Sequence, residues 1–163
     1  MKNCVFAGSF DPFTCGHKAI AEKCLKLFDR LFLVVGENPE KTPLFSLETR
    51  LSAILAEFED NERVKVIAYR DTENYAEFLK ENEVCAYVRG IRDEKDFAYE
   101  QRAEIINRDK YPGVVTVYIS AERGFNMSST EVRRLIREGG DYSGYLPAGT
   151  AKVIAAALEN KDK

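Results

Sequence analysis

The chain has a single histidine, His17, which ends the loop Gly-Ser-Phe-Asp-Pro-Phe-Thr-Cys-Gly-His. This loop joins the apolar run 4–7, a candidate buried strand, to a segment with helical periodicity. The first turn of a helix has free N–H groups, so a junction of this kind commonly binds an anion. An imidazole there can donate to a phosphate oxygen and stabilise developing negative charge. The plainer interpretation is a turn with a surface histidine, but the composition of the loop favours a phosphate site.

Four basic residues follow the predicted strands of an otherwise acidic chain. Lys41 comes after the second strand, Arg89 and Arg92 after the fourth, and Arg123 after the fifth. In open α/β sheets ligands lie beyond the carboxyl ends of the strands, so we expect these cations to converge on one edge. Guanidinium groups bind phosphate in a bidentate way, and lysine supplies a compact charge. Each could be a solvated surface charge, but the run Arg-Gly-Ile-Arg at a strand end favours phosphate binding.

Three hydroxyl residues, Ser128, Ser129 and Thr130, stand at the start of a later predicted helix. Ser128 followed by Glu131 three residues on is a capping box, which needs no ligand. A run of hydroxyls beside unpaired N–H groups is also suited to holding an anion. The sequence favours neither interpretation over the other, and both can hold at once.

Short apolar runs and helical segments alternate along the whole chain. Hydrophobic patterning predicts strands at 2–8, 31–35, 64–68, 84–88 and 114–119. It predicts helices at 16–29, 47–58, 72–82, 93–109, 128–138 and 148–160. This alternation predicts an α/β fold with a doubly wound, mostly parallel, five-stranded Rossmann-like sheet. At 163 residues we expect one domain, 1–163, in which 148–163 form a C-terminal helix and a short charged tail.

The composition excludes several classes of protein. A hydrophobic content of 45% and a net charge of −3 indicate an ordinary globular protein without a broad nucleic-acid surface. No apolar run approaches the roughly 20 residues of a membrane span, and the N-terminus lacks the apolar core of a secretory signal. The four cysteines show no C-x-x-C spacing, so we expect no protein metal site, and free thiols in the cytoplasm.

The histidine loop resembles the first motif, (T/H)xGH, of the nucleotidyltransferase superfamily. Thr14 at its first position is typical of the phosphopantetheine adenylyltransferases, and Lys41 and the Arg-Gly-Ile-Arg run also resemble that family. Residues 127–133 are similar to the second motif, I-S-S-(S/T)-x-x-(R/K), with Met127 in place of the usual isoleucine and Arg133 where many members have lysine. The resemblance extends from Val5 to Pro147.

The resemblance implies a reaction of ATP with 4′-phosphopantetheine that gives 3′-dephospho-coenzyme A and pyrophosphate, a step of coenzyme A biosynthesis. It implies that His17, Lys41 and Arg89 are the catalytic residues. The implied acceptor site is Ser9, Lys41, Thr72, Glu73, Arg89 and Asn107. The implied ATP site is Ser9, Phe10, His17, Gly90, Ile91, Arg92, Glu100, Gly124, Phe125, Asn126, Met127, Ser128, Ser129 and Thr130.

The resemblance also implies Mg²⁺ carried mainly by the ATP phosphates, a homohexamer, and competition by coenzyme A. One segment, 71–75, departs from the small or apolar residues that the family usually has after the third strand. Two alternatives remain open. One is a nucleotidyltransferase for another phosphate acceptor, such as nicotinamide mononucleotide, against which Thr14 argues. The other is a non-catalytic nucleotide-binding module, which would need neither His17 nor a second phosphate site.

Overall fold

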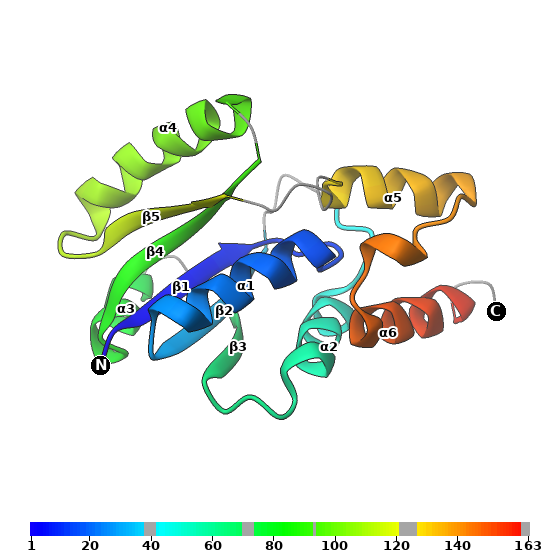
Figure 1. Ribbon diagram of the computed structural model, residues 1–163, viewed down its shortest axis with the longest axis horizontal. Helices are drawn as coiled ribbons and strands as arrows, with labels where there is room; N and C mark the ends of the chain where they lie inside the picture. The colour runs from blue at the N-terminus through cyan, green and yellow to red at the C-terminus, as the bar shows by residue number, and fades with distance from the viewer. Residues whose placement is uncertain (38–41, 70–73, 93, 121–126, 161–163) are drawn as a thin grey trace.

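The computed structural model describes residues 1–37, 42–69, 74–92, 94–120 and 127–160, and only the backbone of residues 95, 99, 102, 103, 106 and 107. In this part of the chain five parallel strands form one sheet in the order β3-β2-β1-β4-β5 (Figure 1). The strands are β1 (Asn3–Gly8), β2 (Arg30–Gly36), β3 (Val64–Tyr69), β4 (Val84–Ile91) and β5 (Val115–Ser120). The prediction of a five-stranded Rossmann-like α/β fold is confirmed.

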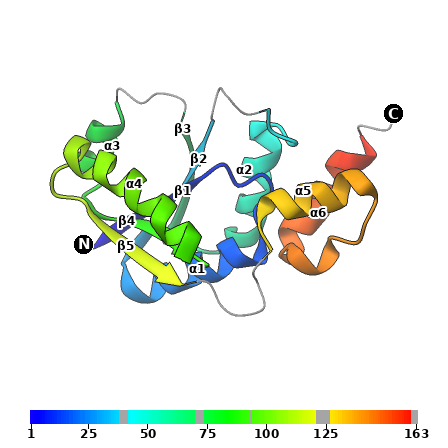
Figure 2. The ribbon, with the colours of Figure 1, turned by 90° about the horizontal axis from the view of Figure 1, so that it is seen from above.

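The helices are α1 (Cys15–Leu27), α2 (Leu47–Phe58), α3 (Tyr75–Glu81), α4 (Glu94–Lys110), α5 (Ser129–Glu138) and α6 (Ala148–Glu159), with a 3₁₀ turn at Ser143–Tyr145. Side chains of α1 and α2 pack on one face of the sheet, and those of α3 pack on the other. Figure 2 shows α3 and α4 to one side of the strands and α1 and α2 to the other. The central strands β1 and β2 are therefore covered on both faces, which explains their unbroken apolar sequences.

The strand order places the topological switch point at β1. The chain moves from β1 outward to β2 and β3, and then returns to β4 on the opposite side of β1. The loops that follow β1 and β4 consequently leave the sheet in opposite directions and open a crevice at its carboxyl edge. This crevice lies between the loop after β1, which leads to His17 in the first turn of α1, and the end of β4 that contains Arg89.

The helices α5 and α6 lie beside the sheet and share a small core of their own (Figures 1 and 2). Val132 of α5 and Ile154 of α6 are fully buried there, together with Phe45 and Leu146. The N-terminus of α5 points toward the carboxyl edge of the sheet, so its first residues face the crevice.

Strand β4 is longer than the sequence pattern predicts. We expected it to end at Val88, but it continues through Arg89 and Gly90 to Ile91. The added residues pair with Tyr118, Ile119 and Ser120 of β5, so a neighbour distant in sequence extends the strand. The first arginine of Arg-Gly-Ile-Arg therefore belongs to the rigid sheet, and only Arg92 follows the strand.

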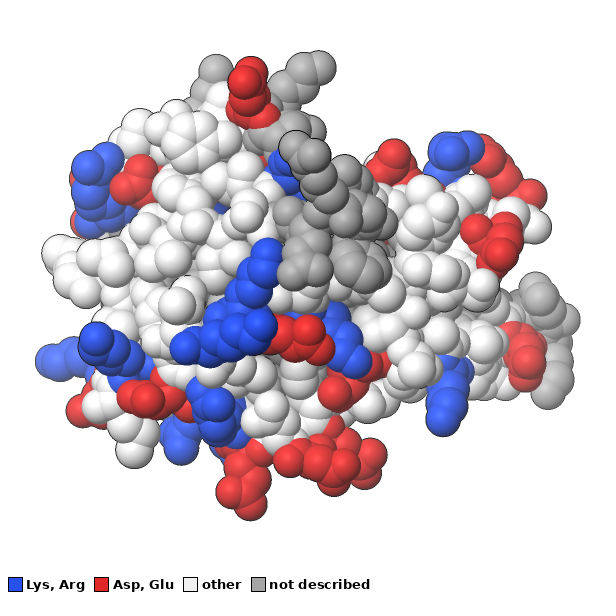
Figure 3. All heavy atoms as spheres, in the orientation of Figure 1, with Lys and Arg blue, Asp and Glu red and all other residues white. Residues whose placement is uncertain are grey.

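Charges of both signs are mixed on the surface that Figure 3 shows, where Lys and Arg side chains over α1 lie next to Asp and Glu. No helix of the described residues combines the length and the apolar character that crossing a bilayer requires. The four cysteines are free thiols.

Candidate active site

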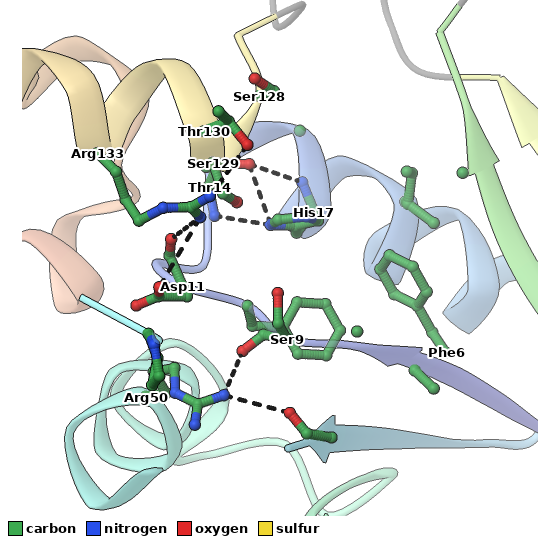
Figure 4. Close-up of a pocket in the computed structure, with 18 of the residues that line it drawn as sticks. Phe6, Ser9, Asp11, Thr14, His17, Arg50, Ser128, Ser129, Thr130 and Arg133 are labelled. Atoms are coloured by element: carbon green, nitrogen blue, oxygen red, sulfur yellow. Dashed lines mark hydrogen bonds and ion pairs between the residues drawn. The ribbon is translucent and has the colours of Figure 1, made fainter. Parts of the chain in front are cut away.

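A cavity of about 740 Å³ opens at the carboxyl edge of the sheet. Its walls come from the end of β1, the start of α1, the ends of β2 and β4, and the start of α5 (Figure 4). This is the crevice that the strand order creates, and it joins segments more than 100 residues apart in the sequence, such as Ser9 and Ser129.

The histidine is held in a defined orientation by the residue that caps its helix. Thr14 is the N-cap of α1 and forms a capping box with His17 at the third helical position. The backbone N–H of Thr14 donates to His17 Nδ1 over 3.0 Å. Because Nδ1 accepts this hydrogen bond, we assign the proton of the neutral ring to Nε2. The motif Thr-x-Gly-His is thus a helix cap that leaves one imidazole N–H available for a ligand.

Aromatic rings surround the His17 imidazole. The ring of Phe13 stacks on it with centroids 5.5 Å apart, and Phe10 meets it edge-on at 5.1 Å. Phe6 lies on a further side at 6.1 Å. Burial among these groups lowers the pKa of His17 to about 4, with the charge of Arg92 as a second cause. His17 is therefore a neutral hydrogen-bond donor at physiological pH.

The carboxylate of Asp11 fixes the loop that precedes the histidine. It is buried and accepts hydrogen bonds from the backbone N–H groups of Leu44 and Phe45 at 2.8 and 2.9 Å. Arg133 of α5 donates to the carbonyl oxygen of Asp11 over 2.6 Å. One residue thus links the loop after β1 to the segment before α2 and to α5, and Figure 4 shows its contact with Arg133. These contacts show that Asp11 fixes the loop.

At the opposite wall, Arg89 lies between an acid and an aromatic ring. Its Nη1 is 3.3 Å from Glu100 Oε2, and its guanidinium carbon is 4.8 Å from the centroid of the Tyr87 ring. Arg92 forms an ion pair with Asp96 one helical turn further along, with Nε and Oδ2 2.8 Å apart. Both arginines and both of their acidic partners line the cavity, so this side of it contains two arginine–carboxylate pairs.

The start of α5 forms the third wall. Ser128 is the N-cap, and its capping box with Glu131 is complete. The two hydrogen bonds from Ser128 lower the pKa of the Glu131 carboxyl. Ser129 Oγ donates to the carbonyl of Pro12 over 2.9 Å, which attaches α5 to the loop after β1. The capping interpretation is confirmed, and the positive end of the α5 dipole still faces the cavity.

Comparisons with known proteins agree with this geometry. A family model described as cytidylyltransferase-like matches residues 5–135. The phosphopantetheine adenylyltransferase of Bacteroides thetaiotaomicron is 37% identical over 150 residues, which cover 91% of this chain and 97% of the relative. That of Porphyromonas gingivalis is 38% identical over 146 residues, which cover 89% and 94%.

The chain belongs to the phosphopantetheine adenylyltransferases of the cytidylyltransferase-like family. The fold is also shared with a bifunctional NMN adenylyltransferase/ADP ribose pyrophosphatase from Francisella tularensis. That structure has a TM-score of 0.74 at 17% identity, with 97% of this chain and 50% of that chain covered. At this identity the likeness concerns the fold alone.

Most of the residues that the resemblance assigns to a phosphopantetheine adenylyltransferase site, where described, meet at this cavity. It is lined by Ser9, Phe10, His17, Arg89, Gly90, Arg92, Glu100, Met127, Ser128, Ser129 and Thr130. Ile91 lies in β4 and is not among the lining residues. Outside the described residues lie Lys41, Thr72, Glu73, Arg123, Gly124, Phe125 and Asn126, and the side chain of Asn107 in α4.

Arg50 is a lining residue that our sequence analysis missed. It lies on the face of α2 that contains Leu47 and Ala53, both buried. Its position three residues from each was the available signal, because a charged residue on an apolar helix face needs a buried partner. A search for hydrophobic periodicity selects apolar residues, so it does not identify a buried arginine on the same helix face.

The described residues contain no group of three or more His, Cys, Asp or Glu side chains placed to hold a metal ion. Asp11, the buried acid of the loop, already accepts two backbone hydrogen bonds. The donor set therefore fits a family in which Mg²⁺ typically comes with ATP.

Proposed function

We propose that this protein transfers the adenylyl group of ATP to 4′-phosphopantetheine and releases pyrophosphate. The single observation that carries the mechanism is that the His17 imidazole, Arg89 and the start of α5 line one cavity. A nucleotide and a second phosphate compound can meet there, with a neutral N–H donor between them. The reaction class follows from the family, and the geometry suits it because it supplies positioning and positive charge.

The acceptor's phosphate is ionised at neutral pH, so the reaction needs no strong base. One of its oxygens attacks the α-phosphorus of ATP, the new P–O bond forms, and the bond to the bridging oxygen of the β-phosphate breaks. The electron pair leaves with pyrophosphate. His17 Nε2–H would donate to an α-phosphate oxygen, where negative charge increases in the transition state. Arg89 and Lys41 would hold the attacking phosphate in line.

The leaving pyrophosphate would lie at the start of α5. Backbone N–H groups and the helix dipole favour an anion there, and Arg92 adds charge from the β4 side. Mg²⁺ bound to the ATP phosphates would neutralise part of their charge. Glu100 would contact ATP, and residues 124–130 would enclose its phosphates and ribose, as the family motif implies. Ser9, Thr72, Glu73 and Asn107 would contact the acceptor.

Further expectations rest on family membership. We propose a single domain that works in the cytoplasm as a homohexamer and is inhibited by coenzyme A in competition with substrate. Size-exclusion chromatography with light scattering tests the assembly. Inhibition kinetics with coenzyme A against each substrate test the competition.

A pyrophosphate-exchange assay tests the function. Radiolabelled pyrophosphate should enter ATP when Mg²⁺ and 3′-dephospho-coenzyme A are present. Nicotinamide adenine dinucleotide, the corresponding product of a nicotinamide mononucleotide enzyme, should give no exchange. Exchange with the latter compound alone would assign a different acceptor. Calorimetry that shows ATP binding without exchange with any product would indicate a non-catalytic binding module.

A further inference from the structure

Arg50 is a buried cation whose partners are backbone carbonyls. Its side chain lies in the wall of the cavity, and the residue is only 2% exposed. Nη1 donates to the carbonyls of Ser9 at 2.8 Å and Gly36 at 3.3 Å, and Nε donates to that of Phe45 at 3.2 Å. No carboxylate of the described residues lies within ion-pair distance of it.

These three carbonyls belong to segments that reach the site separately. Ser9 follows β1 and begins the loop that leads to His17. Gly36 is the last residue of β2, from which the chain continues toward Lys41. Phe45 precedes α2, and its N–H group is held by Asp11. Figure 4 shows the guanidinium bridging the ends of the two strands.

Burying a guanidinium without a counterion is unfavourable, so its hydrogen bonds must offset the lost hydration. The rigid fork of arginine can satisfy several carbonyls whose positions are fixed relative to each other, which the single ammonium of lysine cannot do. An apolar residue would fill the space at a lower cost of desolvation. The retained charge therefore points to a geometric requirement at the ends of β1 and β2.

We propose that Arg50 is a positioning residue that sets the loop after β1 against the end of β2. In this way it aligns the acceptor's phosphate with His17. The inference rests on the proposed adenylyl transfer. Arg50 holds the end of β2, from which the chain continues toward Lys41, the proposed partner of the acceptor's phosphate. None of its hydrogen bonds reaches α5, where the leaving pyrophosphate would lie, so it acts on the acceptor side of the site more than on the ATP phosphates.

The chain provides a control with the same kind of hydrogen bonds at the other end of the sheet. Arg63 also donates to three backbone carbonyls, those of Asp29 at 2.9 Å and of Leu25 and Phe28 at 2.6 Å. These carbonyls lie at the end of α1 and the start of β2, at the amino edge of the sheet. Arg63 is exposed whereas Arg50 is buried, so the two substitutions can differ in their effect on stability, and the comparison is made on the kinetics of the folded proteins.

The experiment compares Arg50→Gln, Arg50→Lys and Arg63→Gln with the wild type. Urea unfolding defines conditions in which each variant is folded. Under those conditions kcat and KM for 4′-phosphopantetheine are measured, and ATP binding is measured by calorimetry.

Arg50→Gln should lower kcat/KM for the acceptor about 10- to 100-fold, as displacements of about 1 Å do. Its ATP dissociation constant should change little. Arg50→Lys should recover only part of the loss, and Arg63→Gln should keep wild-type kinetics.

Equal kinetics of Arg50→Gln and Arg63→Gln would overturn the inference, as would an equal loss of ATP and acceptor binding in Arg50→Gln. Full activity of Arg50→Lys would show that charge alone matters and would overturn the positioning role. A wild-type protein without any exchange would instead overturn the proposed function, and this inference with it.

Discussion

At the scale of single residues, the site depends on a histidine that stays neutral. Thr14 N–H occupies Nδ1, and three phenylalanine rings enclose the imidazole. A neutral ring with its proton on Nε2 can donate to a phosphate oxygen. Because the ring has no charge, the negative charge of the phosphate is left to the arginines to balance. These phenylalanine residues of β1 and the following loop therefore have a chemical consequence beyond packing.

We expect His17 to show this state directly. Long-range ¹⁵N–¹H correlation spectra should place the proton on Nε2, and the ring should titrate with a pKa near the value of about 4 that burial gives it. Because His17 is the only histidine in the chain, its signals need no assignment against others. A titration midpoint near 6.5, the usual value for histidine, would contradict the proposed environment.

The same shift predicts how stability depends on pH. The folded state binds the His17 proton less readily than the unfolded state, so His17 contributes most to stability above its ordinary pKa of 6.5. This contribution falls as the pH decreases from 6.5 through about 4. In urea titrations across this window His17→Gln should lose stability less steeply than the wild type.

His17→Ala should raise the activation free energy of the chemical step by about 2.7–4 kcal/mol, because the transition state loses a hydrogen-bond donor. Steady-state kinetics should therefore show a large fall in kcat and a smaller effect on KM.

Arg89 should act mainly on the acceptor. The loss of a hydrogen bond from a charged donor weakens the free energy of binding by about 1.5–3 kcal/mol. Arg89→Ala should therefore raise KM for 4′-phosphopantetheine by the factor that corresponds to this free energy. The control is Arg134→Ala, because Arg134 also forms an ion pair, with Glu138 at 2.7 Å, but is exposed and is not among the lining residues. Steady-state kinetics with each substrate varied check this. A collapse of ATP binding alone would mean that the two subsites are exchanged.

The sequence predicts residues of this site when they belong to local motifs. Each of three such residues is predicted from its local context: His17 from a loop, Arg89 from a strand end and Ser129 from a helix start. Arg50 escapes because its role depends on the carbonyls of Ser9 and Gly36, which only the fold places beside α2. The sequence also did not predict that Thr14 is the N-cap of α1. The family motif specifies a threonine at this position but does not say what its side chain does.

At the scale of elements, the order of strands and helices follows from hydrophobic patterning, and their ends follow from partners. The sequence predicts strand β2 from an unbroken apolar run, because both faces of this strand are buried. Strand β4 exceeds its apolar run by three residues, because its extension depends on hydrogen bonds with Tyr118, Ile119 and Ser120 of β5. Patterning along one strand contains no information about its neighbour's length.

The contact between α6 and α2 depends on a glycine. A Cβ added to Gly149 would lie 2.6 Å from the carbonyl oxygen of Ala56 and 2.8 Å from Glu57 Oε1. Glu57 accepts the N–H of Thr150 at this helix start, so α6 cannot move away without losing a cap. Overpacking usually costs about 1–3 kcal/mol, and alanine gains about 1 kcal/mol of helix propensity over glycine. Gly149→Ala should therefore lower the free energy of unfolding by a net amount of up to about 2 kcal/mol.

Gly144→Ala provides the control for that substitution. A Cβ there meets no atom within 4 Å, and the backbone has no positive φ. Its stability in urea or thermal unfolding should stay within about 0.5 kcal/mol of the wild type. Reduced flexibility of the unfolded chain would stabilise both variants, so similar losses at both positions would show that the α6–α2 contact does not determine the outcome.

At the scale of the whole molecule, the cavity lies between two packed bodies. The sheet with α1 and α2 forms one core, and α5 and α6 with Phe45 form another. The two are joined near the site by Arg133 to the Asp11 carbonyl and by Ser129 to the Pro12 carbonyl. His17 belongs to the first body and the start of α5, which faces the cavity, to the second. Their relative placement therefore determines whether both could contact one ATP molecule, as proposed.

Weakening the second core should therefore affect both stability and nucleotide binding. Ile154 is fully buried against this core, which also contains Val132 of α5. Ile154→Ala should lower the free energy of unfolding by about 2–5 kcal/mol through lost burial and the cavity it leaves. Leu27→Ala is the control, since Leu27 is 60% exposed at the end of α1 and should cost far less. Because α5 is held by the same core, Ile154→Ala should also weaken ATP binding in calorimetry, whereas Leu27→Ala should not. Unchanged ATP affinity in a folded but destabilised Ile154→Ala would mean that the contacts of Ser129 and Arg133 alone hold α5 at the site.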